Sequence, residues 1–250
     1  MEEDKMVRPY TICYLNCSAD GRIDGEFFRA PESQEPTAIF RRRWLDMQAD
    51  AIIYGAVTMA QFAGGMAAGP NSPWMCEREI FPKTDFVAPC RVSHYYVAVN
   101  IRGTICYDSP YIDKKGRGEH GIIHVLTEDV SDSYVAYLHR LGISYIFCGK
   151  KALEAGTMMD KLYRLFGIKK AIVSGGAYAD WSLLEKGLID EVILLLNPVV
   201  DGNPSAHPVF MRSPGMEAKA VGLELVEVEV VAGGGVFLTY RPKNTVKGFQ

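Results

Sequence analysis

The 250-residue chain lacks the features that mark several large classes of protein. It has no apolar stretch of the roughly 20 residues that a membrane-spanning helix needs. It has no basic excess, because its formal net charge is -3, whereas a general nucleic-acid binder carries a basic field. Its acidic and polar beginning, MEEDKMVRPY, does not resemble a signal peptide. We therefore expect no membrane or nucleic-acid partner, and a cytoplasmic location.

The sequence also lacks the spacings of a metal site. Its six cysteines, at positions 13, 17, 76, 90, 106 and 148, contain no C-x-x-C pair, and we expect reduced thiols. No histidine lies near Cys13 and Cys17 in the sequence to complete a zinc site, and the five histidines are scattered. The neighbouring carboxylates Asp190 and Glu191 fall in an expected strand, where adjacent side chains point to opposite faces. We predict no bound metal.

What is present is an ordinary globular composition, with 48% apolar and 23% charged residues. Without repeats or a linker, it predicts one domain over residues 1–250, with residues 1–7 as a flexible tail. Strand and helix patterns alternate, which predicts an α/β fold with a mainly parallel sheet. We expect strands at 9–17, 49–54, 95–100, 121–126, 143–148, 171–173 and 189–196, and helices at 38–48 (capped by Thr37), 131–141, 153–166 and after Gly176. Residues 222–231 and 236–241 predict an antiparallel hairpin.

Two junctions combine a buried strand, glycine and a helix. The first is Ala171–Val173 followed by Ser174-Gly175-Gly176, and the second is the strand ending at Gly55, with Thr58 in the helix that follows. Glycine lets the backbone approach a ligand closely, and a helix amino terminus favours phosphate. We therefore assign a dinucleotide to these junctions; a plain turn is the alternative at each. Ser174 and Thr58 could also cap their helices.

The remaining irregular segments are expected to be loops. Residues 63–89 contain glycines, prolines and the aromatic residues Trp74 and Phe81. Loops of this length are usually functional or disordered, so we predict a flap near the site. Residues 108–120 are polar and read as a surface loop. Three groups that follow expected strands, Arg102, Thr127 and Lys150, are hypothesised to hold a 2′-phosphate on the ribose of the dinucleotide, the alternative being plain surface residues.

Several short motifs occur in a telling order, namely Arg8-Pro9, SADGRI at 18–23, DAIIYG at 50–55 with Thr58, Gly175-Gly176, LL at 183–184, GLIDE at 187–191, Pro198 and Gly202. With them, nearly the whole chain resembles the reductase (C-terminal) domain of the bifunctional riboflavin-biosynthesis deaminase/reductase. The resemblance implies a dihydrofolate-reductase-like three-layer sandwich, NADPH as hydride donor, a small-molecule substrate and a homodimer. It also implies a pocket between the first loop and the last strands.

The resemblance carries residue roles with it. By similarity, Gly55, Thr58, Gly175 and Gly176 bind the cofactor phosphates, and we add the adjoining Ser174 and Ala177 to the cofactor-binding set. Asn16, Asp20 and Ile23 are expected to border the nicotinamide and the substrate. A reduced C=N or C=O bond also needs a proton, for which Asp20, Tyr14 and an ordered water are the candidates. The alternatives are that Asp20 shapes a turn and that Tyr14 packs in the sheet.

The sequence departs from the family at two positions. Tyr14 stands where the riboflavin enzymes usually carry a lysine, and Ser174 stands where they usually carry a glutamate. The zinc signature of the deaminase half, H-x-E with P-C-x-x-C, does not occur in the sequence. We therefore expect a stand-alone NADPH-dependent reductase acting on a different small heterocyclic or carbonyl compound. The alternatives are the aminopyrimidine reductase of riboflavin biosynthesis, and a module that binds a dinucleotide or pterin without turnover.

Overall fold

The computed structural model describes residues 7–114, 116–215, 217 and 220–245. Within them the chain forms two compact units. Of the described residues, unit 1 contains 7–9, 49–114 and 116–171, and unit 2 contains 10–48, 172–215, 217 and 220–245. The predicted single domain stays a prediction. Of the predicted tail, residues 1–6 lie outside the described part, while the Val7 main-chain N–H donates to Asp160 Oδ1 at 3.3 Å.

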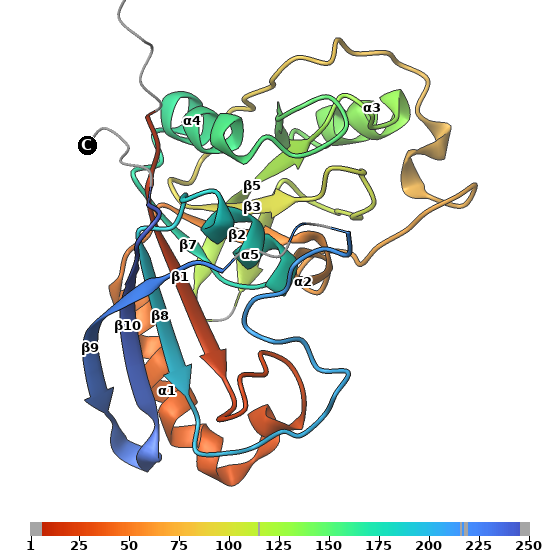
Figure 1. The fold of residues 1–250 in the computed structure, drawn as a ribbon. Helices are drawn as coiled ribbons and strands as arrows, with labels where there is room; N and C mark the ends of the chain where they lie inside the picture. The colour runs from red at the N-terminus through yellow and green to blue at the C-terminus, as the bar shows by residue number, and fades with distance from the viewer. Residues whose placement is uncertain (1–6, 115, 216, 218–219, 246–250) are drawn as a thin grey trace, which may run out of the picture. The chain divides into compact units, whose positions relative to one another are not determined.

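Unit 1 is built on parallel strands (Figure 1). Strands β2 (Ala51–Gly55), β3 (Tyr95–Val99), β5 (Gly118–Leu126) and β6 (Ser144–Phe147) pair in parallel in that order. Strand β4 (Tyr111–Lys114) pairs antiparallel with the beginning of β5. The helices are α2 (Ala56–Ala60), α3 (Asp132–Arg140) and α4 (Ala155–Phe166), with a 3₁₀ turn, η2 (Pro73–Cys76). Strand β7 (Lys170–Val173) leads from unit 1 into unit 2.

Unit 2 contains the carboxyl-terminal antiparallel strands. Strand β1 (Tyr10–Cys17) pairs in parallel with β8 (Glu191–Leu196). Strand β10 (Val236–Pro242) lies antiparallel between β8 and β9 (Leu223–Val230). The unit also holds α1 (Pro31–Asp46), α5 (Ala177–Glu185) and the 3₁₀ turns η1 (Glu26–Arg29) and η3 (Ala232–Gly234). The predicted α/β class, with mainly parallel strands and a terminal antiparallel hairpin, is confirmed.

Local signals placed some elements correctly and others wrongly. Ser131 caps α3, because its side chain accepts from the Tyr134 N–H, at the position where a helix was predicted to begin. Gly167 ends α4 with φ 66°, directly after the predicted end at residue 166. The helix predicted at 38–48 was wrong at its start, since α1 begins at Pro31. Thr37 therefore lies inside the helix and does not cap it. The predicted loop at 108–120 was also wrong, because it contains β4 and the beginning of β5.

The long segment 63–89 is fastened to unit 1 at its carboxyl end. Phe86 and Tyr145 of β6 exchange main-chain hydrogen bonds of 2.9 and 3.0 Å. The Ala88 N–H donates to Ser144 Oγ at 3.1 Å, and Lys83 Nζ donates to two carbonyl oxygens of the loop after β5. The beginning of the segment is held as well, because Gly64 and Ala67 donate to the carbonyl oxygens of Cys106 and Thr104. In its middle, Trp74 is buried against Tyr134 of α3. The flap stays a prediction. No helix within the described ranges is long and apolar enough to cross a membrane.

A buried histidine anchors the interior of unit 1. His124 in β5 is 0% exposed. Its Nε2 lies 3.3 Å from the Asn100 carbonyl oxygen, which can only accept, so Nδ1 accepts from the Tyr107 hydroxyl at 3.0 Å. The Tyr137 hydroxyl in turn bonds the main chain of Tyr107. Both ring nitrogens are therefore satisfied in the neutral form, and burial lowers the pKa of His124 to about 3.

This burial predicts an acid-sensitive stability. The folded pKa lies below the unfolded value of about 6.5, so the unfolded state binds more protons between these values and stability falls as pH falls. At pH 5 the loss from this one group should be about 2 kcal/mol relative to neutral pH. Urea unfolding of wild type and His124→Gln at pH 7 and pH 5 measures it. We expect the pH-dependent loss to be smaller in the variant by that amount; equal losses would contradict the assignment.

Candidate functional site

The carboxyl end of β7 leads into the double glycine predicted to hold phosphate. Gly175 and Gly176 have φ angles of 118° and 96°, a backbone region that side chains rarely adopt. Helix α5 begins at Ala177 directly after them, and its first-turn N–H groups point toward this end. Gly176 is the N-cap residue and no side chain caps the helix, so the capping interpretation of Ser174 was wrong. The half-buried Ser174 is left at the edge of the turn.

The second junction lies in unit 1, after β2. Gly55 is the N-cap residue of the five-residue α2, again without a side-chain cap. Thr58 is partly exposed and lies inside α2, so it does not cap the helix either. At both junctions a strand leads through glycine into a helix, as predicted. Because neither the Ser174 nor the Thr58 hydroxyl caps its helix, both stay candidates for binding a ligand.

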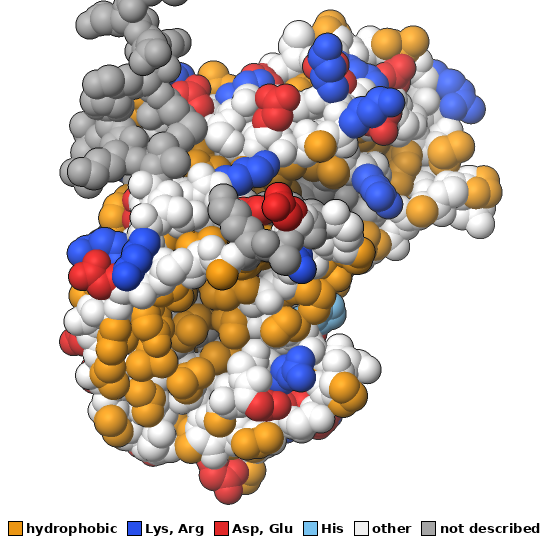
Figure 2. All heavy atoms as spheres, viewed as in Figure 1, with side chains coloured by type: hydrophobic (Ala, Val, Ile, Leu, Met, Phe, Trp, Pro, Cys, Tyr) orange, Lys and Arg blue, Asp and Glu red, His pale blue; other side chains and the backbone are white. Residues whose placement is uncertain are grey.

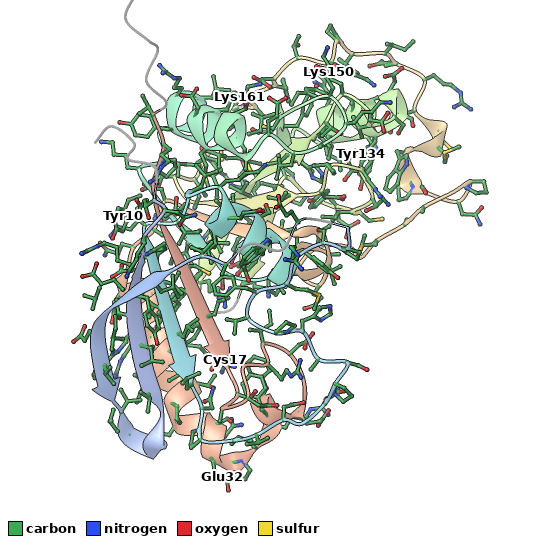
Figure 3. The ribbon with its side chains drawn as sticks, viewed as in Figure 1. Tyr10, Cys17, Glu32, Tyr134, Lys150 and Lys161 are labelled. Atoms are coloured by element: carbon green, nitrogen blue, oxygen red, sulfur yellow. The ribbon has the colours of Figure 1, made fainter. Side chains whose placement is uncertain are left out.

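Three loops of unit 1 meet where parallel strands end. Thr127 follows β5 and donates its hydroxyl to the Ile101 carbonyl oxygen of the loop after β3, at 3.2 Å. The N–H groups of residues 128 and 129 donate to carbonyl oxygens of Gly149 and Lys150 after β6. Arg102 and Lys150 are exposed, and Figure 3 labels Lys150 on its loop. The structure thus brings the three predicted 2′-phosphate groups to one edge of unit 1, where ligands of α/β sheets usually bind.

The loop after β1 is built around Asp20. Its Oδ1 accepts from the Ser18 hydroxyl at 2.6 Å and the Asp201 N–H at 2.9 Å, and its Oδ2 accepts from the Gly202 N–H at 3.0 Å. These bonds, the one from Ser18 first, hold the pKa of the Asp20 carboxyl below its usual range. A carboxylate that stays ionised is a poor proton donor at neutral pH. The geometry therefore favours the turn-shaping role for Asp20.

The same loop is joined along its length to residues 199–209. The Ile23 N–H donates to the His207 carbonyl oxygen at 2.9 Å, and Asp24 accepts from the His207 main chain and ring. Gly25, at φ 125°, leaves room for Asp201, because an added Cβ would lie 2.5 Å from its Oδ2. Ile23 is partly exposed at this joint. Sequence reasoning did not identify Asp24 and Asp201, which look like ordinary loop residues until their partners are known.

A buried polar cluster lies at the carboxyl ends of β1 and β8. Asn16 donates to Thr37 Oγ1 of α1 at 3.0 Å and accepts from the side chain of Asn197, which follows β8. Asn197 also donates to the Cys17 carbonyl oxygen at 2.8 Å; Figure 3 labels Cys17 at the end of β1. Asn197 was missed from the sequence, although its place directly after a strand, like that of Asn16, is a signal that could have indicated it.

Tyr14 lies deep in unit 2. It is 0% exposed, its ring stacks on Phe40 with centroids 4.1 Å apart, and its hydroxyl donates to the Phe40 carbonyl oxygen at 3.1 Å. Burial raises the pKa of this phenol above its ordinary value. A phenol that already donates to the main chain and resists ionisation favours the packing interpretation. No three His, Cys, Asp or Glu side chains gather as a possible metal site among the described residues.

Comparisons with known proteins give the geometry a context. The sequence model of the RibD C-terminal domain family matches residues 9–237 of this chain. The 2,5-diamino-6-ribosylamino-4(3H)-pyrimidinone 5′-phosphate reductase of Aquifex aeolicus is 23% identical over 219 residues, covering 85% of this chain and 86% of the relative. A solved pyrimidine reductase-like protein of Corynebacterium diphtheriae shares the fold with a TM-score of 0.64 at 16% identity, covering 94% of this chain and 92% of the other.

A second solved structure, the riboflavin biosynthesis reductase of Saccharomyces cerevisiae, has a TM-score of 0.60 at 18% identity and covers 97% of this chain and 93% of its own. At such identities a structural likeness shows the fold. The dihydrofolate-reductase-like α/β fold expected from the sequence is confirmed.

Proposed function

Because this chain belongs to the RibD C-terminal domain family, we propose that it is an NADPH-dependent reductase that transfers a hydride to a small heterocyclic or carbonyl substrate. The observation that carries the proposal is the turn Gly175-Gly176, which opens α5 with two positive φ angles at the carboxyl end of β7. Such a turn offers main-chain N–H groups to an anion without a Cβ in the way. Its geometry fits the phosphates of a dinucleotide.

Each group has a place in this proposal. In unit 2, Ser174 to Ala177 hold the cofactor phosphates, and NADPH when bound supplies the hydride. The phosphate role that the family resemblance implies for Gly55 and Thr58 of unit 1 stays a prediction. Arg102 and Lys150 hold the 2′-phosphate, and Thr127, which is 1% exposed and donates to the Ile101 carbonyl oxygen, fixes the loop that carries Arg102. This assignment rests on their shared edge in unit 1.

The substrate side is assigned to unit 2. Asn16, fixed by Thr37 and Asn197, and Ile23 border the nicotinamide and the substrate. Asp20 shapes the loop that carries Ile23, and Tyr14 supports Asn16 from the same strand. Because Asp20 stays ionised and the Tyr14 hydroxyl is engaged, we assign the proton to an ordered water.

The proposal is tested by NADPH oxidation against a panel of pyrimidine, pterin and carbonyl compounds. A reductase should oxidise NADPH with at least one of them on the order of once per second or faster. A second candidate function, reduction of the aminopyrimidine ribose phosphate of riboflavin biosynthesis, is favoured by the name of the Aquifex aeolicus relative. If NADPH binds saturably but none of the compounds oxidises it, the alternative function is favoured, namely a module that binds a dinucleotide without turnover.

We also propose that the protein forms a homodimer through the outer strands of unit 2. Register places Val228 and Val230 of β9 on the same face as Leu238 of β10 and Leu194 of β8. Val228 and Val230 are 54% and 74% exposed, and Figure 2 shows apolar side chains gathered over these strands. The face carries no charge along these four positions, which suits a second copy of itself.

A charge on this face should break the dimer. We expect Val228→Lys to sediment as a monomer at concentrations where wild type is a dimer, because the interface would bury an unpaired ammonium. Glu227→Lys is the matched control, since the neighbouring side chain on the strand points to the opposite face. Analytical ultracentrifugation of the three proteins measures the result. A dimeric Val228→Lys, or a monomeric wild type, would contradict the proposed interface.

A further inference from the structure

A buried carboxyl group lies next to the glycine turn and has no role in the function proposed above. Asp180 is in the first turn of α5 and is 0% exposed. By strict hydrogen-bond geometry neither of its oxygens is paired among the described residues, although the Gly175 main-chain N–H lies near enough to act on the carboxyl. Buried carboxylates are almost always paired, so an unpartnered one is the exception that needs an explanation.

The surroundings of Asp180 disfavour a negative charge on it. The Cys13 thiol of β1 interacts electrostatically with Asp180. It is itself 0% exposed and carries no positive charge, so it cannot compensate a negative charge on the carboxyl. The Gly175 main-chain N–H favours the ionised form, but burial outweighs it and raises the pKa of Asp180 well above its ordinary value. An isolated carboxyl in such a place gives up its charge by keeping its proton.

Asp180 is also coupled to the turn through the main chain. Its N–H donates to the Gly176 carbonyl oxygen at 3.0 Å, and the Ala179 N–H donates to the same oxygen at 2.7 Å. The carboxyl therefore belongs to the helix turn that follows the two glycines directly. A negative charge at this position would oppose an anion on the turn, whereas a neutral acid does not.

We infer that Asp180 is a proton-controlled regulator of cofactor binding: the neutral acid permits a phosphate at the Gly175-Gly176 turn, and its ionisation at higher pH weakens that binding. The inference rests on the proposed function, because it takes the nucleotide phosphates as the anion. By linkage, a bound phosphate must also strengthen the hold of Asp180 on its proton. NADPH binding at high pH should therefore be accompanied by proton uptake.

The test is the dissociation constant of NADPH between pH 7 and pH 10, measured by fluorescence for wild type and Asp180→Asn. In this range the nucleotide phosphates keep a constant charge. The wild-type constant should rise with pH, by at most tenfold per pH unit where Asp180 ionises, and the curve of Asp180→Asn should stay flatter. Glu185→Gln, at the other end of α5, is the matched control and should follow wild type.

A second measurement needs no variant. Calorimetric titration of wild type with NADPH in two buffers of different ionisation enthalpy counts the protons taken up. We expect uptake approaching one proton per site at the pH where affinity falls. Binding with the same pH profile in wild type and Asp180→Asn, or without proton uptake, overturns this inference alone. Failure of wild type to bind NADPH at pH 7 contradicts the proposed function, and this inference with it.

Discussion

Replacing Gly176 with valine is expected to lower NADPH affinity roughly ten- to a hundredfold while the protein remains folded. Gly176 has φ 96° and ψ 93°, which a β-branched residue avoids, and strain of this kind costs on the order of 1 to 3 kcal/mol. The branched side chain would also stand where phosphate must approach the first N–H groups of α5. The backbone strain lowers the stability of the free and the bound protein alike. The affinity falls because a charge-assisted hydrogen bond to the phosphate is lost, which costs about 1.5 to 3 kcal/mol, or roughly ten- to a hundredfold in the dissociation constant.

A control substitution distinguishes the effect of backbone strain at a positive φ from the effect of blocking the phosphate site. Gly142 has φ 67°, and an added Cβ there would meet nothing within 4 Å. Gly142→Val should therefore lose some thermal stability but keep its NADPH affinity. Isothermal titration and thermal melting of both variants provide the comparison. If Gly176→Val melts like Gly142→Val and binds NADPH like wild type, the glycine turn does not hold the cofactor.

The second large effect concerns the substrate. We expect no turnover of the deaminated ribosylamino-pyrimidine phosphate at an enzymatic rate. The substrate phosphate carries close to two negative charges, and the riboflavin enzymes usually present a lysine where Tyr14 stands. The Tyr14 hydroxyl is buried and donates to the Phe40 carbonyl oxygen, so it offers the phosphate neither charge nor a free donor. Loss of a charged partner costs on the order of 2 to 3 kcal/mol, roughly a hundredfold in rate.

Ser174 adds to this expectation, because it supplies no carboxylate at the position before the glycines. The assay follows absorbance of NADPH with excess substrate. It is run with the deaminated compound and also with the 2,5-diamino-pyrimidinone phosphate for which the Aquifex aeolicus relative is named, and that relative is the positive control for the second compound. The partly exposed Arg22 and the exposed Arg29 of the neighbouring loop are the cations that could replace the missing lysine. Turnover on the order of once per second or faster would show the expectation wrong and favour the riboflavin-pathway function.

Local chemistry predicted much of this fold, and long-range contacts decided the rest. The Ser131 cap and the Gly167 terminus depend on neighbouring residues, so the sequence was sufficient for them. The start of α1 was not predictable, because Pro36 in its second turn suggests a break. In the structure Pro36 packs against the hairpin turn: a Cβ added to Gly235 would lie 2.7 Å from it. This tertiary contact is 199 positions away in the chain and overrides the local signal.

The candidate site shows the same division. The glycine turn was predicted, since strand, glycine and helix are adjacent in the chain. The roles of Asp20 and Asn16 were not resolved, because their partners Asp201 and Asn197 come from the segment after β8, about 180 residues away. The burial of Asp180 could not be predicted from the sequence. An aspartate in the first turn of a helix is ordinarily solvated and interacts favourably with the helix dipole. Its burial follows only from the packing of α5.

The most direct test of the account is a crystal structure of the wild-type protein with NADPH. We expect the nucleotide pyrophosphate within hydrogen-bond distance of the main-chain N–H groups of Gly176 and Ala177, and the nicotinamide beside Asn16 or Ile23. Nucleotide density elsewhere, with the turn of Gly175 and Gly176 empty at saturating NADPH, would contradict it.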